Sequence, residues 1–201
     1  MTRRRTAVLA ALALVVPVAA PAASTNISDV PAGRYVIDKR HSSLIARVMH
    51  MGVSLYTVRF DTLDASFDYN PAHPEATRLT ASVDPASLDV NADYGRQFAE
   101  EFLSASKFPT ATFVATSAQA TGPSQGLLTG DLTLMGVTRP ITFNVTLIGS
   151  GHEVLPLPAG QHAVGFEATT SLKRSDFGST YLDNLVGDDV TLTIEAEFDR
   201  R

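Results

Sequence analysis

The sequence contains no cysteine, and this absence excludes several kinds of chemistry at once. With none among its 201 residues, the chain can form no disulfide, offers no thiolate nucleophile, and has no cysteine to which a lipid could be attached after cleavage of a leader. An uninterrupted apolar run of about 20 residues, as a membrane-spanning helix requires, is also missing. We therefore expect no stable membrane anchor.

Positive charge is scarce beyond the first few residues. The chain has 16 lysines and arginines against 21 acidic residues, for a formal net charge of −5. Without Arg3, Arg4 and Arg5, 13 basic residues remain and the net charge is −8. No basic cluster larger than pairs such as Lys173-Arg174 is left, so nucleic acid is not an expected partner.

Motifs for catalysis and for metal binding are also lacking. The five histidines are His41, His50, His73, His152 and His162, and no two of them have a tight ligand spacing. His41 and His50 flank one predicted strand and would lie about 30 Å apart if it were straight. The Asp176-Phe177-Gly178 tripeptide has no glycine-rich loop upstream, and we interpret it as a turn. We expect no metal and no cofactor, and favour a protein that is not an enzyme.

The first residues have the layout of a secretory signal. Arg3-Arg4-Arg5 precedes the apolar run Ala7 to Val16, and the small-residue stretch Ala19 to Ala23 offers a cleavage site after Ala22 or Ala23. We predict a signal peptide over residues 1–23, a short linker over 24–32 and one domain over 33–201. The mature protein is then periplasmic or secreted, with Sec and twin-arginine export both open.

After Gly33 the sequence alternates between apolar and polar residues, which is typical of a sheet with one buried face. Val190 to Phe198 shows this most clearly, with apolar residues on one parity and Thr and Glu on the other. Nine strands are predicted: Arg34 to Asp38, Ser43 to His50, Leu55 to Tyr69, Arg78 to Val83, Thr110 to Ser117, Leu127 to Met135, Ile141 to Ile148, Ala163 to Leu172 and Asp189 to Phe198. The apolar parity changes within Leu55 to Tyr69, which predicts a bulge or bend near Asp61.

These strands predict an all-β fold, an antiparallel barrel of about eight strands. One segment differs, because Tyr94, Phe98, Phe102 and Ala105 recur at helical spacing. We predict a short amphipathic helix over Asp93 to Ala105 that caps one end of the barrel, either plugging the core or acting as a lid. A Pro-rich loop is predicted over Gly149 to Gly160. Parity places Leu44, Val48, Phe143, Val145, Phe166, Leu192 and Ile194 inside, and Thr142, Thr191 and Glu195 outside.

Five motifs, in order and spacing, resemble the YceI-like family over about Gly33 to Phe198. They are Tyr35-Val36-Ile37-Asp38 with His41-Ser42, His50-x-Gly52, Phe108 to Phe113, Gly130 to Pro140, and Arg174 to Gly178 before Asp189-Val190. The resemblance implies a secreted lipocalin-like barrel that binds long apolar molecules, such as polyisoprenoids or fatty acyl derivatives. The chain departs from the family at Ala46, where an aromatic residue is frequent, and at Arg96-Gln97, where a His-Leu pair is expected.

On this basis we expect a carrier for a polyisoprenoid, an isoprenoid quinone or a fatty acyl derivative. The residues expected to line the ligand site inside the barrel are Leu44, Ala46, Val48, His50, Phe113, Leu132, Phe143, Val145, Phe166, Leu192 and Ile194. The residues expected at a mouth or lid are His41, Phe98, Phe102, Arg174 and Asp176.

Several alternatives stay open at this point. A structural or stress-protection protein would have a filled barrel, and an enzyme acting on an apolar substrate would have a polar cluster deep inside. His50 could be satisfied by backbone at a strand end, and the Lys173 to Asp176 segment could be a solvated loop. A homodimer is also open.

Overall fold

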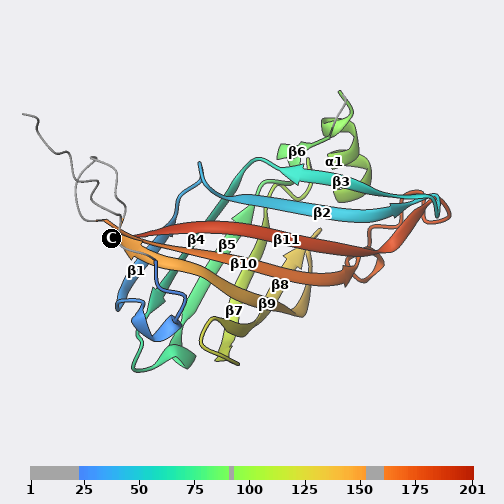
Figure 1. Cartoon of the computed structure of the whole chain (residues 1–201). Helices are drawn as coiled ribbons and strands as arrows, with labels where there is room; N and C mark the ends of the chain where they lie inside the picture. Colours follow the sequence, from blue (N-terminus) through green and yellow to red (C-terminus); the bar gives the residue numbers. More distant parts are fainter. Residues whose placement is uncertain (1–22, 91–92, 153–160) are drawn as a thin grey trace, which may run out of the picture.

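The computed structural model describes residues 23–90, 93–152 and 161–201 (Figure 1). The predicted signal peptide lies outside this range except for Ala23, and so does the predicted Pro-rich loop from residue 153 onward. Gly149 to His152, which were predicted to belong to that loop, instead form the end of a strand. In the described part of the chain, no helix is long and apolar enough to cross a membrane.

Nearly all regular structure is antiparallel strand. The strands are β1 (Gly33–Ile37), β2 (Ser43–His50), β3 (Ser54–Phe60), β4 (Leu63–Tyr69), β5 (Arg78–Val83), β6 (Leu88–Asp89), β7 (Ala111–Ala120), β8 (Gln125–Leu134), β9 (Val137–His152), β10 (His162–Lys173) and β11 (Val186–Arg200). The helices are α1 (Gly95–Leu103) and the 3₁₀ turns η1 (Ile27–Asp29), η2 (Pro74–Ala76), η3 (Pro85–Ser87) and η4 (Arg174–Phe177).

Eight of the strands close into a barrel, as predicted. The ring runs β1-β4-β5-β7-β8-β9-β10-β11 and returns to β1, which is hydrogen-bonded to β4 on one side and to β11 on the other. Closure gives each strand of the ring a hydrogen-bonded neighbour on both sides. The β5–β7 ladder is short, because it joins only Thr80 to Val83 with Ala111 to Val114.

The long strand β11 has two partners in succession along the same edge. Its end pairs with β1, with Ile37 opposite Phe198. Its middle pairs with β2, with Ser43 opposite Glu195. The strands β2, β3 and β6 therefore extend the sheet beyond the closed ring, and in Figure 1 β2, β10 and β11 run on past β7, β8 and β9.

The predicted strand Leu55 to Tyr69 is divided into β3 and β4 by a bend at Asp61, which confirms the predicted irregularity. Because the chain turns there, β3 joins the extension and β4 joins the ring. The two-residue strand β6 was not predicted, since so short a segment has no readable alternation.

The predicted orientation of side chains is confirmed along the barrel wall. Leu44 and Phe143 are buried, whereas Thr142, Thr191 and Glu195 are exposed. Inside, Phe67 stacks on Tyr35 at a centroid distance of 4.9 Å and meets Phe198 edge-on at 5.0 Å. Aromatic contacts of this kind fix the spacing of β1, β4 and β11 around the ring closure.

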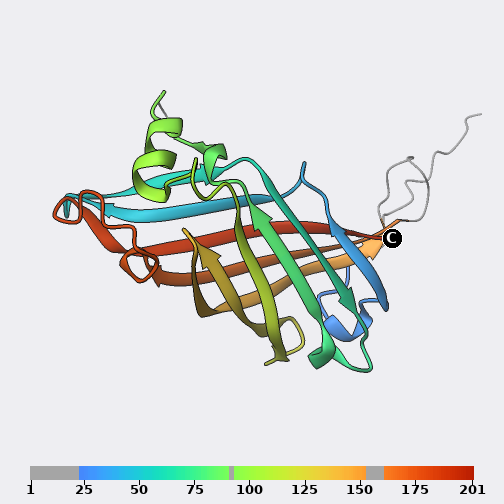
Figure 2. The ribbon, with the colours of Figure 1, turned by 180° about the vertical axis from the view of Figure 1, so that it is seen from behind.

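The helix α1 lies within the predicted range but packs elsewhere than predicted. Ala99 is buried in a cluster with Leu88 and Val90, and Phe98 meets Tyr56 of β3 edge-on at 6.3 Å. Since β3 and β6 belong to the sheet extension, α1 covers that extension and does not cap the end of the closed ring (Figure 2). The helix ends at Ser104, which has a left-handed conformation. The N–H of Ser104 donates to the carbonyl of Glu100, and the N–H of Ala105 donates to the carbonyl of Ala99.

One cross-strand pair on the outer face opposes two like charges. Glu167 of β10 lies directly opposite Glu195 of β11. Desolvation raises the pKa of Glu195, and the negative charge of Glu167 raises it further. Glu195 is therefore a destabilising residue in its ionised form.

We expect Glu195→Gln to stabilise the protein at pH 7 by roughly 0.5 kcal/mol, a small value because Glu195 is exposed and solvent screens its interaction with the half-buried Glu167. Because the native pKa is raised, wild-type stability falls as pH rises from the ordinary value of 4.5 through the native value. The gain should therefore disappear in acid. Urea unfolding from pH 4 to pH 7 measures it, with Asp131→Asn as the control, since Asp131 lies opposite Val114 and Pro140. Equal gains in both variants would contradict the assignment.

Candidate functional site

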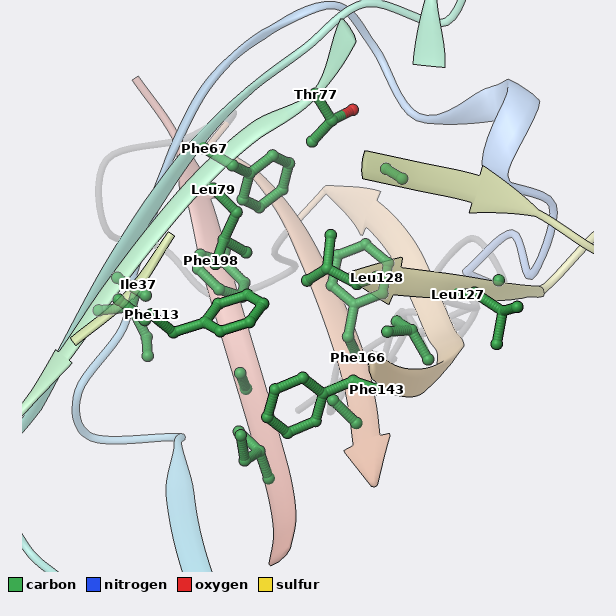
Figure 3. A pocket seen from close by; sticks show the side chains of 18 of the residues that line it. Ile37, Phe67, Thr77, Leu79, Phe113, Leu127, Leu128, Phe143, Phe166 and Phe198 are labelled. Carbon is green, nitrogen blue, oxygen red and sulfur yellow. The ribbon is translucent and has the colours of Figure 1, made fainter. Parts of the chain in front are cut away.

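The barrel encloses a cavity of about 270 Å³. Five phenylalanines from five strands surround it: Phe67 of β4, Phe113 of β7, Phe143 of β9, Phe166 of β10 and Phe198 of β11 (Figure 3). Between them lie small lining residues such as Ala65, Ala81 and Ala168. The alternation of large and small side chains on the inner face leaves space at the centre that the aromatic rings do not fill.

Polar groups are confined to the ends of this cavity. At one end Asp64, Ser82 and Thr112 form a row across β4, β5 and β7. At the other end Thr77 and Gln125 contribute polar groups. Figure 3 shows the middle of the wall, where the labelled side chains Leu79, Phe113, Leu128 and Phe143 are hydrocarbon. The cavity therefore suits an apolar ligand with few head-group contacts.

The titratable groups of the lining do not converge. Asp64 is the single charged residue among the described lining residues, and its Oδ2 accepts a hydrogen bond of 2.6 Å from the Lys39 Nζ. The hydroxyl of Tyr69 donates a hydrogen bond to the carbonyl of Ile27, and burial raises the pKa of its phenol. Neither arrangement pairs an acid with a base across the cavity, as proton transfer to a substrate would require.

The size of the cavity limits what it holds. A methylene group takes about the volume of a water molecule, roughly 30 Å³. The cavity of about 270 Å³ therefore accommodates a segment of about nine carbon atoms. This is two isoprene units or the end of an acyl chain, so a longer ligand must continue outside it.

Eight of the residues that we expected inside the barrel line this cavity: Leu44, Phe113, Leu132, Phe143, Val145, Phe166, Leu192 and Ile194. Contact between these residues and a ligand stays a prediction. Several lining residues were not singled out from sequence, including Phe67, Leu79, Leu128 and Phe198. Their signal was present in the alternation of Leu63 to Tyr69, in which Leu63, Ala65, Phe67 and Tyr69 are all buried.

The other three expected residues lie beyond the cavity along β2. Ala46 is buried between Val58 and Leu192, its cross-strand neighbours, and does not line the cavity. Val48 is half-buried opposite Tyr56 and Val190. His50 was expected to point inward, but it is exposed at the end of the strand, with its ring 6.0 Å from that of Tyr56. The alternation predicts which face of β2 these residues occupy. Because β2 extends past the closed ring, that face does not border the cavity at these three positions.

None of the residues expected at a mouth or lid lines the cavity. Phe98 and Phe102 pack against each other at 5.8 Å, and Phe102 contacts Tyr181 edge-on at 5.0 Å. Asp176 is exposed on η4. These residues lie at the extension of the sheet, where α1 meets the connection between β10 and β11.

Arg174 has a structural position in that connection. Its side chain is buried, and the guanidinium donates to the carbonyls of Gly187, Ser179, Tyr181 and Val186 at 2.9–3.0 Å. The guanidinium also lies 5.9 Å from the centre of the Phe102 ring. Arg174 therefore holds the connection between η4 and β11 in place through its hydrogen bonds. The sequence predicted either a solvated loop or a polar rim here, and both predictions were wrong for this residue.

His41, the remaining mouth candidate, belongs to a polar cluster away from the cavity. One ligand atom each from Asp38, His41 and Glu197 lies within 4.8 Å of the others, a spacing that could hold a metal ion. However, Arg40 already binds both oxygens of Asp38, through Nε at 3.1 Å and Nη2 at 2.9 Å. The Arg40 hydrogen bonds hold the pKa of Asp38 well below its usual range. A cation at this place would have to displace Arg40.

We expect Arg174→Met to destabilise the protein by about 2–3 kcal/mol, because it leaves four carbonyl groups without their donor while keeping an unbranched stem in the buried position. Urea unfolding measures the loss. Arg96→Met, at an exposed position of α1, is the control and should change little. Equal stability of the two variants would contradict a structural role for Arg174.

Comparison with solved structures shows the same architecture in other proteins. BcnA of Burkholderia cenocepacia superposes with a TM-score of 0.70 at 24% identity, covering 80% of this chain and 98% of BcnA. A polyisoprenoid binding domain from Saccharophagus degradans superposes with a TM-score of 0.63 at 17% identity, covering 83% of this chain and 98% of the domain. At these identities the likeness establishes the fold.

Sequence comparison establishes the relationship. A UPF0312 protein of Pseudomonas fluorescens is 40% identical over 159 residues, covering 75% of this chain and 78% of the relative. A UPF0312 protein of Vibrio cholerae is 39% identical over 162 residues, covering 76% of this chain and 84% of the relative. The YceI-like domain matches residues 35–198, which include β2 to β10, three of the five residues of β1 and all but the last two residues of β11. The chain is therefore a member of the YceI-like family.

Proposed function

We propose that this protein binds a long apolar molecule inside its barrel and carries it, with a polyisoprenoid, an isoprenoid quinone or a fatty acyl derivative as the ligand. The observation that carries this proposal is the hydrocarbon wall of the cavity. Five phenylalanines surround its middle part, and polar groups lie only at its ends. The similar fold of a polyisoprenoid binding domain supports it. No cofactor has a part in this function.

The cavity also separates this proposal from its alternatives. A structural protein with a filled barrel would have side chains in the space of about 270 Å³ that lies between the phenylalanines. An enzyme would need titratable groups that converge on a substrate. Among the described lining residues the one charged group, Asp64, is paired with Lys39 at the rim. We therefore favour binding over catalysis.

The energetics suit a carrier. Burial of a methylene contributes about 0.8 kcal/mol, so about nine carbons in the cavity contribute roughly 7 kcal/mol before the cost of association. Any further binding energy comes from the part of the chain that continues outside the cavity. Affinity then follows chain length more than head-group chemistry, and the ligand can be released where another apolar phase is offered.

We place the carrier outside the cytoplasm, with a mature chain that begins near Ala23 or Ser24. The backbone of Ser24 pairs with that of Ser150 through two hydrogen bonds of 2.8 Å. A chain cleaved at this point thus keeps the contact that joins its first residues to β9. Mass spectrometry of the protein purified from the periplasm or the medium gives the first residue directly.

The test of ligand binding places bulk in the cavity. Ala168 lines it, and Ala168→Phe places an aromatic ring in the space of about 270 Å³, which removes a substantial part of the room for a ligand. We expect bound lipid per protein to fall severalfold while the melting temperature stays close to that of the wild type, because the ring enters ligand space. Mass spectrometry of organic extracts from the purified natively exported protein measures the lipid.

Val114→Phe is the matched control, because Val114 is exposed on the outer face next to the lining residue Phe113. It introduces the same aromatic ring without entering the cavity and should retain its lipid. If Ala168→Phe retains as much lipid as the control, or if the wild type yields no apolar molecule, the proposed function is wrong. A destabilised Ala168→Phe would show a packed barrel instead.

A further inference from the structure

Two neighbouring turns form the end of the molecule farthest from the C-terminus (Figures 1 and 2). Both turns carry exposed apolar side chains. On the β2–β3 hairpin, Met51 is 57%, Val53 86% and Leu55 61% exposed. We define the apolar tip as Met49, Met51, Val53, Leu55, Tyr181, Leu182 and Leu185. In both views this tip projects beyond β7, β8 and β9.

The two turns form a single, well-fixed surface. The N–H of Met51 donates to the carbonyl of Leu185 at 2.7 Å, and His50 pairs with Val186. The second turn is held by Arg174, which donates to the carbonyls of Ser179, Tyr181 and Val186. The exposed side chains therefore stand on a defined backbone that Arg174 anchors from inside.

Backbone requirements do not explain these apolar residues. Met51 has φ +53° and Leu182 has φ +51°, in the left-handed region that favours Gly and Asn. Methionine and leucine are unfavourable choices there, and both are exposed to solvent. Two adjacent turns thus place large apolar side chains where turn formation and solubility each favour a polar residue. This combination indicates a contact with an apolar phase.

Charge within the two turns is low, and Glu101 of α1 adds one carboxylate beside Tyr181. Residues 49–55 and 181–187 contain Asp183 as their one formally charged residue, apart from His50. A partner recognised through phosphate or carboxylate groups would require cationic side chains. The occupant that fits is itself apolar or zwitterionic.

The area and shape of the tip distinguish a bilayer from a second copy of the chain. The tip has seven side chains, each with roughly 150 Å² of surface when fully exposed and each about half exposed. Together they present on the order of 500 Å² of apolar surface to solvent. Stable dimers bury about 800 Å² per partner on matching surfaces. A projecting pair of turns presents less than this, but it suits insertion among lipid chains, with Tyr181 at the interfacial level.

An apolar strip connects this tip with the cavity. Successive inward positions on β2 and β11 pair Leu44 with Ile194, Ala46 with Leu192, and Val48 with Val190. The first pair lines the cavity and the last approaches the tip, where His50 pairs with Val186. A chain too long for the cavity has this strip as its continuation.

We propose that the apolar tip docks into the surface of a lipid bilayer, so that the strip meets the acyl chains and a ligand passes between bilayer and cavity. The passage of ligand rests on the proposed function, whereas the docking does not. Docking depends on apolar contact, so it requires no anionic lipid and persists in salt.

The experiment measures how much of each protein floats with phosphatidylcholine vesicles in a density gradient. It compares the wild type with the triple variant Met51→Asn/Val53→Thr/Leu182→Asn. Asparagine is favoured at both left-handed positions and threonine is close in shape to valine, so this variant should fold. The control, Val114→Thr/Ile148→Thr, removes two exposed apolar side chains elsewhere; these are 49% and 57% exposed. We expect the triple variant to lose roughly tenfold or more in vesicle partition, and the control to behave as the wild type.

Three further measurements make the outcome decisive. Flotation is repeated in about 0.5 M sodium chloride and with added phosphatidylglycerol, and binding that needs the anionic lipid or is lost in salt overturns the proposal. Light scattering gives the oligomeric state, and a wild-type dimer that the triple variant breaks would assign the tip to a second copy. Wild type that does not float, or a triple variant that floats equally, also overturns it.

Binding of cis-parinaric acid without vesicles separates docking from the proposed function. The triple variant should bind this probe as well as the wild type does, since the cavity is unchanged. If neither protein binds it but only the wild type floats, docking stands and the cavity proposal fails. If both proteins bind it and neither floats, the docking proposal fails by itself.

Discussion

The structure depends on the closure of one sheet by β1, a strand of five residues between β4 and β11. Closure gives the ring an inside, and the pleat then assigns every second residue of eight strands to it. The same step divides β11 between two partners, because β1 occupies its last residues and β2 the residues before them. A closed barrel and an open extension therefore share one strand, and the cavity lies in the closed part.

Whether a ring of eight strands becomes a filled core or a cavity is decided by the sizes of the inward residues. Here phenylalanines on five strands alternate with alanines, such as Ala65, Ala81, Ala168 and Ala196, that line the same space. Rings in edge-to-face contact, such as Phe113 with Phe143 at 5.3 Å, support one another from the wall. They stabilise the barrel without occupying its centre, and the alanines leave the remaining volume to a ligand.

The sequence predicts most of this fold because alternation is a local property. The bounds of β2 and β5 are predicted correctly, as are the bend at Asp61 and the inward face of β9, β10 and β11. What a face meets is not local. Ala46, Val48 and His50 have the predicted parity of Leu44, yet they extend past the ring, where α1 and the β10–β11 connection replace opposing strands. The burial of Arg174 depends on carbonyls of residues 179–187, whose arrangement no residue spacing reveals.

The low polarity of the cavity bears on how a carrier of this kind would load and unload. A bilayer interior and a hydrocarbon wall solvate a methylene about equally, so transfer between them changes the free energy little, whereas transfer into water costs about 0.8 kcal/mol per methylene. A carrier that met only water would therefore bind a long chain and hold it. Release requires an apolar path, and under the docking proposal this path is the strip along β2 and β11 between the cavity and the exposed apolar tip. The two proposals thus support each other physically: a cavity with few polar contacts needs docking for exchange, and docking needs no head-group selectivity because the cavity binds hydrocarbon.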